Sequence, residues 1–225
     1  MSKHLKAYAA PKSWIILRKV NKWITRPAPG AHEKQKAFPI GLLIKQLGFA
    51  RTAREVKKIL NDKNVSVDGK VIMDRHFSVG FMDAIQIKPS TLLRGKYDEK
   101  GRLVFVPMPK DESTKKVCKV IGKRTIAGGK LQLNLFDGRN VLVDKSDVAI
   151  GDSLVLELPS QKVIEHLPLG KGAVAFLLAG RHTGVIGTVE SIDGDKIKCS
   201  KGKEQFETLK RFAFVLGKNK AVVKV

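Results

Sequence analysis

The residues of this chain whose types can do chemistry are mainly cations, and one segment spaces them regularly. Arg51, Arg54, Lys57 and Lys58 fall within a single short stretch. On a helix, Arg54 and Lys58 lie one turn apart and opposite the apolar side chains, with Lys57 at the flank. Guanidinium and ammonium groups in this arrangement bind phosphates. A solvated helix face gives the same pattern, and this segment alone does not decide between the two.

The cationic character extends over the whole chain. Its 225 residues carry a net charge of +22, whereas solubility alone needs a net charge of roughly 2–8 in a small domain. Such an excess repels itself unless a polyanion neutralises it, so nucleic acid is the expected partner and an anionic membrane surface is second. The first 40 residues have the strongest local excess, with nine Lys and Arg and one acid.

Motifs for catalysis and for cofactors are lacking. The sequence contains no GxxxxGK[ST], HExxH or GxSxG segment, and its five histidines are scattered without metal-ligand spacing. Cys118 and Cys199 stand alone, which fits a reducing compartment and argues against structural zinc. No apolar stretch approaches the roughly 20 residues of a membrane span. We therefore predict no enzyme activity, no cofactor, no metal, no membrane and no small-molecule substrate.

Short elements are expected to position the cations at 51–58. Thr52 and Glu55 form a capping-box pattern that starts a helix, and Asp68-Gly69 is a hairpin turn signal. The expected elements are a helix at 40–46 closed by Gly48, the helix from Thr52, a hairpin at 65–72 and a strand at 83–87. Two helices and a hairpin would make a compact polyanion-binding surface.

The N-terminal 37 residues are expected to form a basic extension. Prolines break regular structure here, and we expect an extended arm around one short helical stretch at 13–23 that becomes ordered on binding. Trp14 and Trp23 alternate with the cations. Their rings can stack on bases, or they can anchor the arm to the protein's own core.

The rest of the chain predicts β structure. Alternation and turn signals predict strands at 116–121, 130–136, 140–143 and 153–158, as in a small sandwich or barrel. After Gly172 the pattern changes to a strand at 173–178, a glycine-rich segment at 180–189 and a last clear strand at 196–199. The tip at Arg181 and His182 either contacts a partner or is merely exposed.

Several segments together resemble known families. The run A-R-T-A-R-E-V-K-K followed by V-S-V-D-G-K-V is similar to the S4-type RNA-binding module, over about residues 40–87. The segment at 180–189 resembles a KOW motif. Three further runs resemble the archaeal and eukaryotic-type ribosomal S4e family: Lys3-His4-Leu5-Lys6, Ala10-Pro11-Lys12-Ser13-Trp14 and Gly80-Phe81-Met82-Asp83. The resemblance runs nearly from end to end.

The resemblance implies a multi-domain α+β fold and a structural role. Its expected parts are a basic N-terminal extension at 1–37, the S4-type (alpha-L) module with its hairpin at 38–101, a central β domain at 102–172 and an SH3-like β domain of KOW type at 173–225. A member of this family is a cytoplasmic constituent of the small ribosomal subunit. Its partners are small-subunit rRNA and neighbouring ribosomal proteins.

Two other functions stay open at this point. S4-type modules also occur in RNA-modifying enzymes, and KOW motifs occur in transcription or translation factors that bind transiently. The candidate RNA-binding residues under the ribosomal hypothesis are Lys3, His4, Lys6, Lys12, Trp14, Arg18, Lys19, Lys22, Arg26, Lys34, Lys36, Arg51, Arg54, Lys57, Lys58, Lys70, Arg75, Arg181 and His182.

Overall fold

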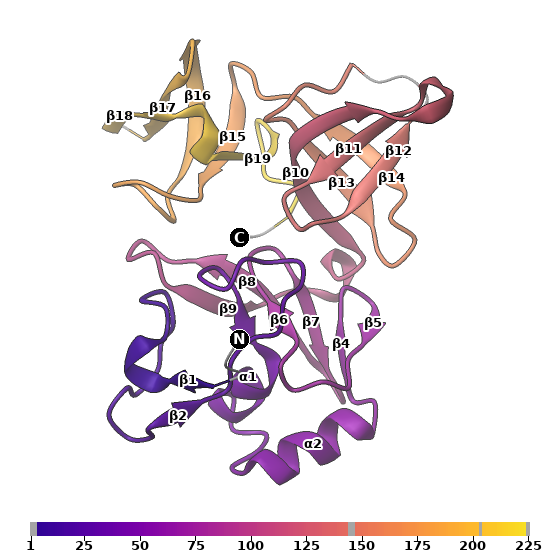
Figure 1. Cartoon of the computed structure of the whole chain (residues 1–225). Helices are drawn as coiled ribbons and strands as arrows, with labels where there is room; N and C mark the ends of the chain where they lie inside the picture. Colours follow the sequence, from indigo (N-terminus) through magenta and orange to yellow (C-terminus); the bar gives the residue numbers. More distant parts are fainter. Residues whose placement is uncertain (1–3, 144–146, 203, 224–225) are drawn as a thin grey trace. The chain divides into compact units, whose positions relative to one another are not determined.

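The computed structural model describes residues 4–143, 147–202 and 204–223. The chain divides into two compact units, Met1–Lys96 with Arg102–Ser113, and Tyr97–Gly101 with Thr114–Val225. Antiparallel sheets dominate both, and the described residues contain two α-helices (Figure 1). The expected multi-domain α+β class is therefore confirmed. None of the described helices is long and apolar enough to cross a membrane.

The first unit contains both helices and three small sheets. The helices are α1 (Ile40–Gln46) and α2 (Ala53–Asn61), with 3-10 turns at Ala7–Ala9 and Lys110–Glu112. Two-stranded sheets pair β1 (Leu5–Lys6) with β2 (Trp23–Ile24) and β3 (Phe38–Pro39) with β6 (Ser78–Val79). The five-stranded sheet has the order β5 (Lys70–Val71), β4 (Val65–Val67), β7 (Ala84–Ile87), β8 (Thr91–Tyr97), β9 (Leu103–Pro107).

The expected helices are both present because their local signals agree with their packing. Helix α1 buries Leu43 and Ile44 and ends before Gly48, whose φ of +81° is in the left-handed region that glycine tolerates. Helix α2 starts at the predicted cap and buries Val56 and Leu60. Since α1 and α2 pack together, each buries the apolar face that the other needs.

The predicted hairpin at 65–72 is also confirmed. Asp68 and Gly69 have φ of 51° and 78°, so both central residues of the two-residue turn have positive φ, as in type I′. Strand β7 matches the strand expected at 83–87. Strand β9 pairs with β8 in this sheet, and residues Arg102–Ser113 belong to the first unit.

The helix expected at 13–23 is wrong. This segment consists of turns and irregular backbone up to β2, because tertiary contacts fix its course. Leu5, Ala7 and Ala10 are buried, and the backbone N–H of Leu103 donates to the carbonyl of Ser13 at 2.9 Å. The N-terminal residues from His4 onward therefore pack on the first unit and do not form a free arm.

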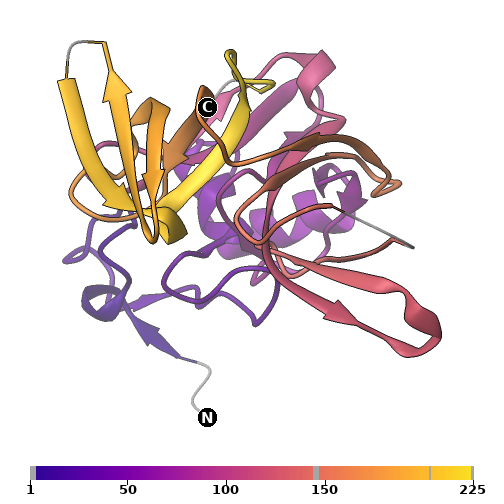
Figure 2. The ribbon, with the colours of Figure 1, turned by 90° about the horizontal axis from the view of Figure 1, so that it is seen from above.

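The second unit contains two five-stranded antiparallel sheets (Figure 2). The central sheet has the order β12 (Asn140–Val143), β11 (Leu131–Leu135), β10 (Lys115–Thr125), β13 (Ser153–Glu157), β14 (Val163–Leu167). The C-terminal sheet has the order β18 (Glu204–Leu209), β17 (Lys196–Lys201), β16 (Ile186–Asp193), β15 (Ala173–Leu177), β19 (Ala213–Lys218). Further 3-10 turns span Ala127–Gly129 and Lys210–Phe212.

The predicted central strands are confirmed, while the C-terminal prediction stopped too early. Residues 196–199 are not the last strand, because β18 and β19 follow. Strand β18 reads E-Q-F-E-T-L and has little apolar patterning, and all six of its side chains are exposed or half-buried. Strand β19 is almost wholly buried and pairs with β15, so its continuous apolar run lacks the alternation used to find strands.

Candidate nucleic-acid interface

The outer side of α2 presents the cations that the spacing predicted. Arg54, Lys57 and Lys58 on this side are exposed, and so is Arg51 directly before the helix. The opposite side is buried at Val56, which is 1% exposed, and at Leu60, which is 0% exposed. Ala53 is exposed as well, and Ile59 is half-buried. Because the core does not use the four cations, they are available to a polyanion.

A reciprocal cap fixes the start of this cationic face. The hydroxyl of Thr52 accepts the backbone N–H of Glu55 at 3.2 Å and donates to its carboxylate at 2.8 Å. The same carboxylate accepts the backbone N–H of Arg51 at 2.8 Å. The hydrogen bonds from the Arg51 backbone and the Thr52 hydroxyl hold the pKa of Glu55 below its ordinary value. Arg51 is thus held directly before the first turn of the helix.

The hairpin adds one more exposed cation to this unit. Lys70 lies on β5, directly after the Asp68-Gly69 turn, and its side chain is exposed. Figure 1 shows β4 and β5 beyond the C-terminal end of α2. The helix α2 and the hairpin thus each carry exposed cations in the first unit, and a shared polyanion-binding surface stays a prediction.

Trp14 is a correction to the predicted RNA-binding residues. Its side chain is 3% exposed, its indole N–H donates to the carbonyl of Ala37 at 2.8 Å, and its ring meets Phe38 edge-on at 5.1 Å between centroids. The ring belongs to the core because this hydrogen bond satisfies its one donor. In this structure Trp14 anchors the N-terminal segment, as the alternative interpretation proposed, and has no face available to a base.

Trp23 is the tryptophan that reaches the surface. It is 51% exposed on β2, and its ring lies 5.4 Å from the ring of His4. The ammonium of Lys22 lies 5.4 Å from the Trp23 ring centroid, within cation–π range. Sequence spacing gave both tryptophans the same possible roles, because only tertiary contacts distinguish the buried ring from the exposed one.

Arg18 has a structural role in the segment. Its guanidinium donates to the carbonyl oxygens of Ala10 and Pro11, both at 2.8 Å, and to two further carbonyls in the same turn. A cation that satisfies several backbone carbonyls holds the loop in place. Its contact with RNA stays a prediction, and the exposed neighbouring cations are better placed to bind a phosphate.

The other predicted cations of the extension lie at the surface. Exposed side chains are those of His4, Lys6, Lys12, Lys19, Lys22, Lys34 and Lys36, and Arg26 is half-buried. Lys36 forms an ion pair with Glu33 at 3.0 Å. Lys3 lies outside the described residues.

A buried histidine fixes the end of the extension to the module. His32 and Asp83 lie 2.8 Å apart, Nε2 to Oδ2, and both side chains are almost wholly buried. The same carboxylate oxygen accepts the backbone N–H of Gly80 at 2.8 Å. A Cβ at Gly80 would collide with the His32 ring, so glycine allows this close approach. The cations before His32 are therefore held on a folded segment.

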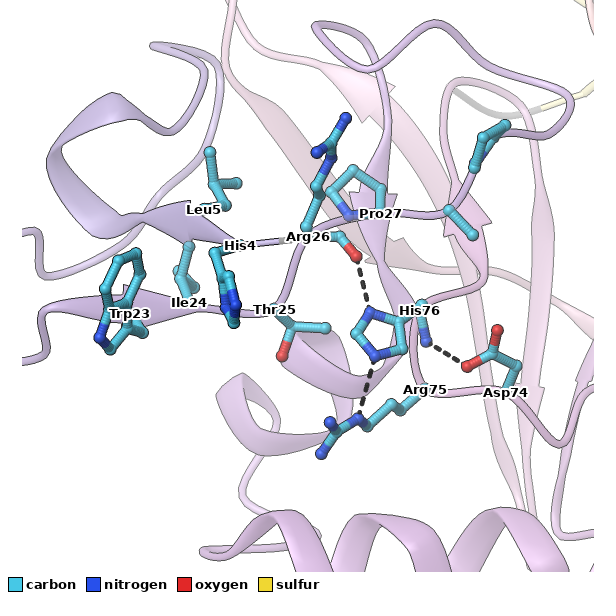
Figure 3. A pocket seen from close by; sticks show the side chains of 12 residues that line it. His4, Leu5, Trp23, Ile24, Thr25, Arg26, Pro27, Asp74, Arg75 and His76 are labelled. Carbon is cyan, nitrogen blue, oxygen red and sulfur yellow. Dashed lines mark hydrogen bonds between the residues drawn. The ribbon is translucent and has the colours of Figure 1, made fainter. Parts of the chain in front are cut away.

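A cavity of about 870 Å³ brings together predicted residues from distant parts of the sequence (Figure 3). His4 and Arg26 line it from the N-terminal segment, and Arg75 lines it from the turn between β5 and β6. His76 Nδ1 donates to the carbonyl of Arg26 at 2.8 Å, and Arg75 Nε donates to His76 Nε2 at 3.2 Å. Sequence reasoning missed His76 and Trp23 as lining residues, because no local pattern connects them.

The C-terminal candidates form a separate cluster in the second unit. Arg181 is exposed, whereas His182 is half-buried and stacks on Phe206 at 4.6 Å between ring centroids. Gly180 and Gly184 have φ of +94° and +82° and shape the loop between them. Arg181 thus stands at the tip of a glycine-defined loop, while the stacked ring of His182 supports it.

Neither a metal centre nor a membrane helix is found in the described part of the chain. No group of three or more His, Cys, Asp or Glu side chains there could hold a metal ion. Both cysteines are free and buried.

Comparison with known proteins gives matches along most of the chain. Three family models match it: the RS4NT domain at residues 1–35, the S4 domain at 42–85 and ribosomal family S4e at 93–163. The small ribosomal subunit protein eS4 of Methanothermobacter thermautotrophicus is 38% identical over 98% of this chain and 95% of its own. That of Korarchaeum cryptofilum is 40% identical over 100% of this chain and 97% of its own.

A solved structure agrees with these relatives. The crystal structure of the 30S ribosomal protein S4e from Thermoplasma acidophilum matches with a TM-score of 0.70 at 30% identity. The match covers 81% of this chain and 95% of that one.

Proposed function

The chain belongs to ribosomal family S4e, and from this premise we propose that it is a non-enzymatic structural protein of the small ribosomal subunit that binds small-subunit rRNA. Small-subunit rRNA and neighbouring ribosomal proteins are its partners in the cytoplasm. The exposed cations on the outer side of the capped helix α2 are the observation that carries the proposal. They lie in the part of the chain that matches the S4 domain.

The mechanism is electrostatic positioning. Each Lys or Arg that neutralises a phosphate releases condensed counterions, and this release supplies affinity without reading sequence. A-form RNA hides its major-groove base edges, so the protein recognises mainly the shape and the backbone of folded rRNA. The capped helix, the hairpin and the anchored N-terminal segment hold their cations on rigid backbone, which reduces the entropy lost on binding.

We also infer that residues 173–225 form an SH3-like domain of KOW type. The observed strand order, in which the first strand β15 lies between β16 and the last strand β19, supports this inference. So does the glycine-defined loop at 180–184 that presents Arg181. Within this proposal, the central β domain lies in the predicted segment 102–172, from Thr114 onward where the second unit continues, and Arg181 is a phosphate contact.

Binding of helix variants to rRNA tests the proposal. The double variant Arg54→Gln, Lys58→Gln removes two exposed cations that the core does not use. We expect affinity for folded small-subunit rRNA fragments to fall by roughly tenfold or more near 150 mM salt, as for the loss of two phosphate contacts. The melting temperature should stay nearly unchanged, since surface substitutions away from buried features usually change stability by less than about 0.5 kcal/mol.

The matched control removes the same charge elsewhere. Lys162 and Lys171 are exposed and lie outside the candidate residues. Lys162→Gln with Lys171→Gln should lower affinity much less than the helix variant. Equal losses for the two double variants would show that net charge matters and that α2 is not the binding face. Wild-type protein that binds heat-denatured and folded rRNA equally would contradict recognition by shape.

A further inference from the structure

The cavity between the β1–β2 pair and the turn at 74–76 has the size of a ligand site. Its volume is about 870 Å³, within the range of roughly 300–1,000 Å³ that small-molecule sites occupy. Figure 3 shows His4 and Thr25 on one side and Arg75 and His76 on the other. A phosphate alone does not need such a space, and a continuous RNA duplex does not enter it.

One wall of the cavity is aromatic. The rings of His4 and Trp23 are 5.4 Å apart and tilted by 51°. Trp23 keeps 51% of its surface exposed, although hydrophobic rings of this size are usually buried. A nucleobase can stack on such a ring whatever its sequence, because every base has a π face.

The opposite wall is cationic and held in place. Arg75 is exposed, and its Nε–H donates to His76 Nε2 at 3.2 Å. Since the Arg26 carbonyl only accepts, His76 carries its proton on Nδ1, and Nε2 is left as the acceptor for Arg75. Asp74 accepts the backbone N–H of His76 at 2.9 Å and fixes the turn.

Helix α1 anchors the same turn from behind. The backbone N–H of Gly41 donates to the carbonyl of Arg75 at 3.0 Å, and a Cβ at Gly41 would lie 2.9 Å from that oxygen. The backbone at Arg75 is therefore fixed to α1 before a ligand arrives, and the bond from His76 to the Arg26 carbonyl links the same turn to the N-terminal segment. A preorganised pairing of a guanidinium with a stacking ring suits one phosphate and one base.

We propose that this cavity binds a single unpaired nucleotide of rRNA, with its base stacked on Trp23 and its phosphate on Arg75. The proposal rests on the proposed function and names the RNA element that one part of the first unit takes. An unstacked nucleotide fits because its base face is accessible, which is not so inside a duplex.

The test uses three RNA hairpins that differ at one position. The first has a single bulged adenosine, the second has an abasic residue in the bulge, and the third is fully paired. The full-length protein should bind the bulged adenosine roughly tenfold more tightly than the abasic bulge, and its tryptophan fluorescence should be quenched, because stacking contributes to affinity for each base. Trp14 is buried and gives a constant background.

Matched variants separate the two walls from general charge. Trp23→Ala should remove most of the preference for the adenosine bulge over the abasic bulge. Arg75→Gln should instead weaken binding of both bulges relative to the paired hairpin, because both bulged residues keep the phosphate. Tyr8→Ala is the control for Trp23, because Tyr8 is 70% exposed with Lys6 at 5.7 Å from its ring, yet it does not line the cavity. Arg54→Gln should weaken all three hairpins alike.

Equal binding of the three hairpins, or a preference that survives Trp23→Ala, would overturn the proposal while leaving rRNA binding intact. Loss of all binding to folded rRNA would instead contradict the proposed function. A photo-crosslinking residue at position 23 in assembled subunits gives an independent readout. Crosslinks to rRNA support the nucleotide site, and crosslinks to a neighbouring protein overturn it.

Discussion

At the scale of single residues, a glycine allows two backbone segments of the first unit to approach each other closely. Gly95 on β8 accepts the backbone N–H of Met82 at 2.8 Å and donates to the carbonyl of Asp83 at 3.2 Å. A Cβ at Gly95 would collide with the carbonyl oxygen of Gly80. The 80–83 turn that receives His32 thus lies directly on β8, and its position depends on a residue without a side chain.

We predict that Gly95→Ala destabilises the first unit by about 1–3 kcal/mol, because a methyl group in a filled space forces the backbone to move. Urea unfolding followed by far-UV circular dichroism measures the change. Gly30→Ala is the matched control, since the nearest atoms to a Cβ there belong to Ser78 at 3.9 Å. Equal destabilisation by the two substitutions would show that the close contact at Gly80 is unimportant.

At the scale of elements, local signals were sufficient where they coincide with burial. The helix at 40–46, the cap at Thr52 and the Asp68-Gly69 turn were predicted from the sequence because each combines a backbone signal with an apolar face. The strands β18 and β19 were missed, since one is polar and the other is buried on both sides. The helix expected at 13–23 was wrong, because contacts made by Trp14 with Ala37 and Phe38 determine that segment.

The residues of the candidate site also differ in whether a local sequence pattern predicted them. The cations of α2 follow from periodicity within nine residues. The cavity at Arg75 combines segments about 50 positions apart through the bond between His76 and Arg26, and no periodicity extends over that distance. The sequence could not distinguish the buried Trp14 from the exposed Trp23, because the exposure of each ring depends on tertiary contacts.

Lys119 joins two sheets of the second unit. Its ammonium on β10 donates to the carbonyl of Ala213 at 2.6 Å and to that of Arg211 at 2.8 Å, next to β19. Burial, with a smaller effect of nearby Lys210, lowers the pKa of Lys119 from 10.5 to about 8. Between these two pH values the unfolded chain binds this proton and the folded chain does not, so the free energy of unfolding rises with pH.

We predict that Lys119→Met weakens the second unit and that the gap from wild type widens as the pH is raised from 7 to 10. The substitution leaves buried carbonyls without a donor, at a cost of roughly 1–3 kcal/mol for an unsatisfied group. Urea unfolding at several pH values measures both effects. Lys162→Met, at an exposed lysine, should show no widening. A constant gap for Lys119→Met would contradict the lowered pKa.

At the scale of the whole molecule, the chain has a net charge of +22, and its exposed lysines differ in whether a carboxylate lies close to them. Lys12, Lys19 and Lys34 are exposed on the folded N-terminal segment. In the C-terminal sheet, Lys196 and Lys198 lie within 4 Å of carboxylates of Glu207 and Asp193, at 3.8 and 3.7 Å. Lys201 lies 3.4 Å from Glu99. A lysine that already has a carboxylate beside it gains less from a phosphate.

Two triple variants with the same change in net charge should therefore differ in the salt dependence of rRNA binding. Lys12, Lys19 and Lys34 changed to Gln should reduce the slope of log K against log salt by roughly 2–3, since each phosphate contact contributes about 0.7–0.9. Lys196, Lys198 and Lys201 changed to Gln should reduce it by clearly less. Filter binding to a folded small-subunit rRNA fragment between low and high salt gives both slopes. Equal reductions of the slope would mean that rRNA binding depends on the net charge of the protein and not on where the lysines lie. A smaller reduction of the slope by the N-terminal set than by the C-terminal set would show that the main phosphate contacts lie on the C-terminal sheet.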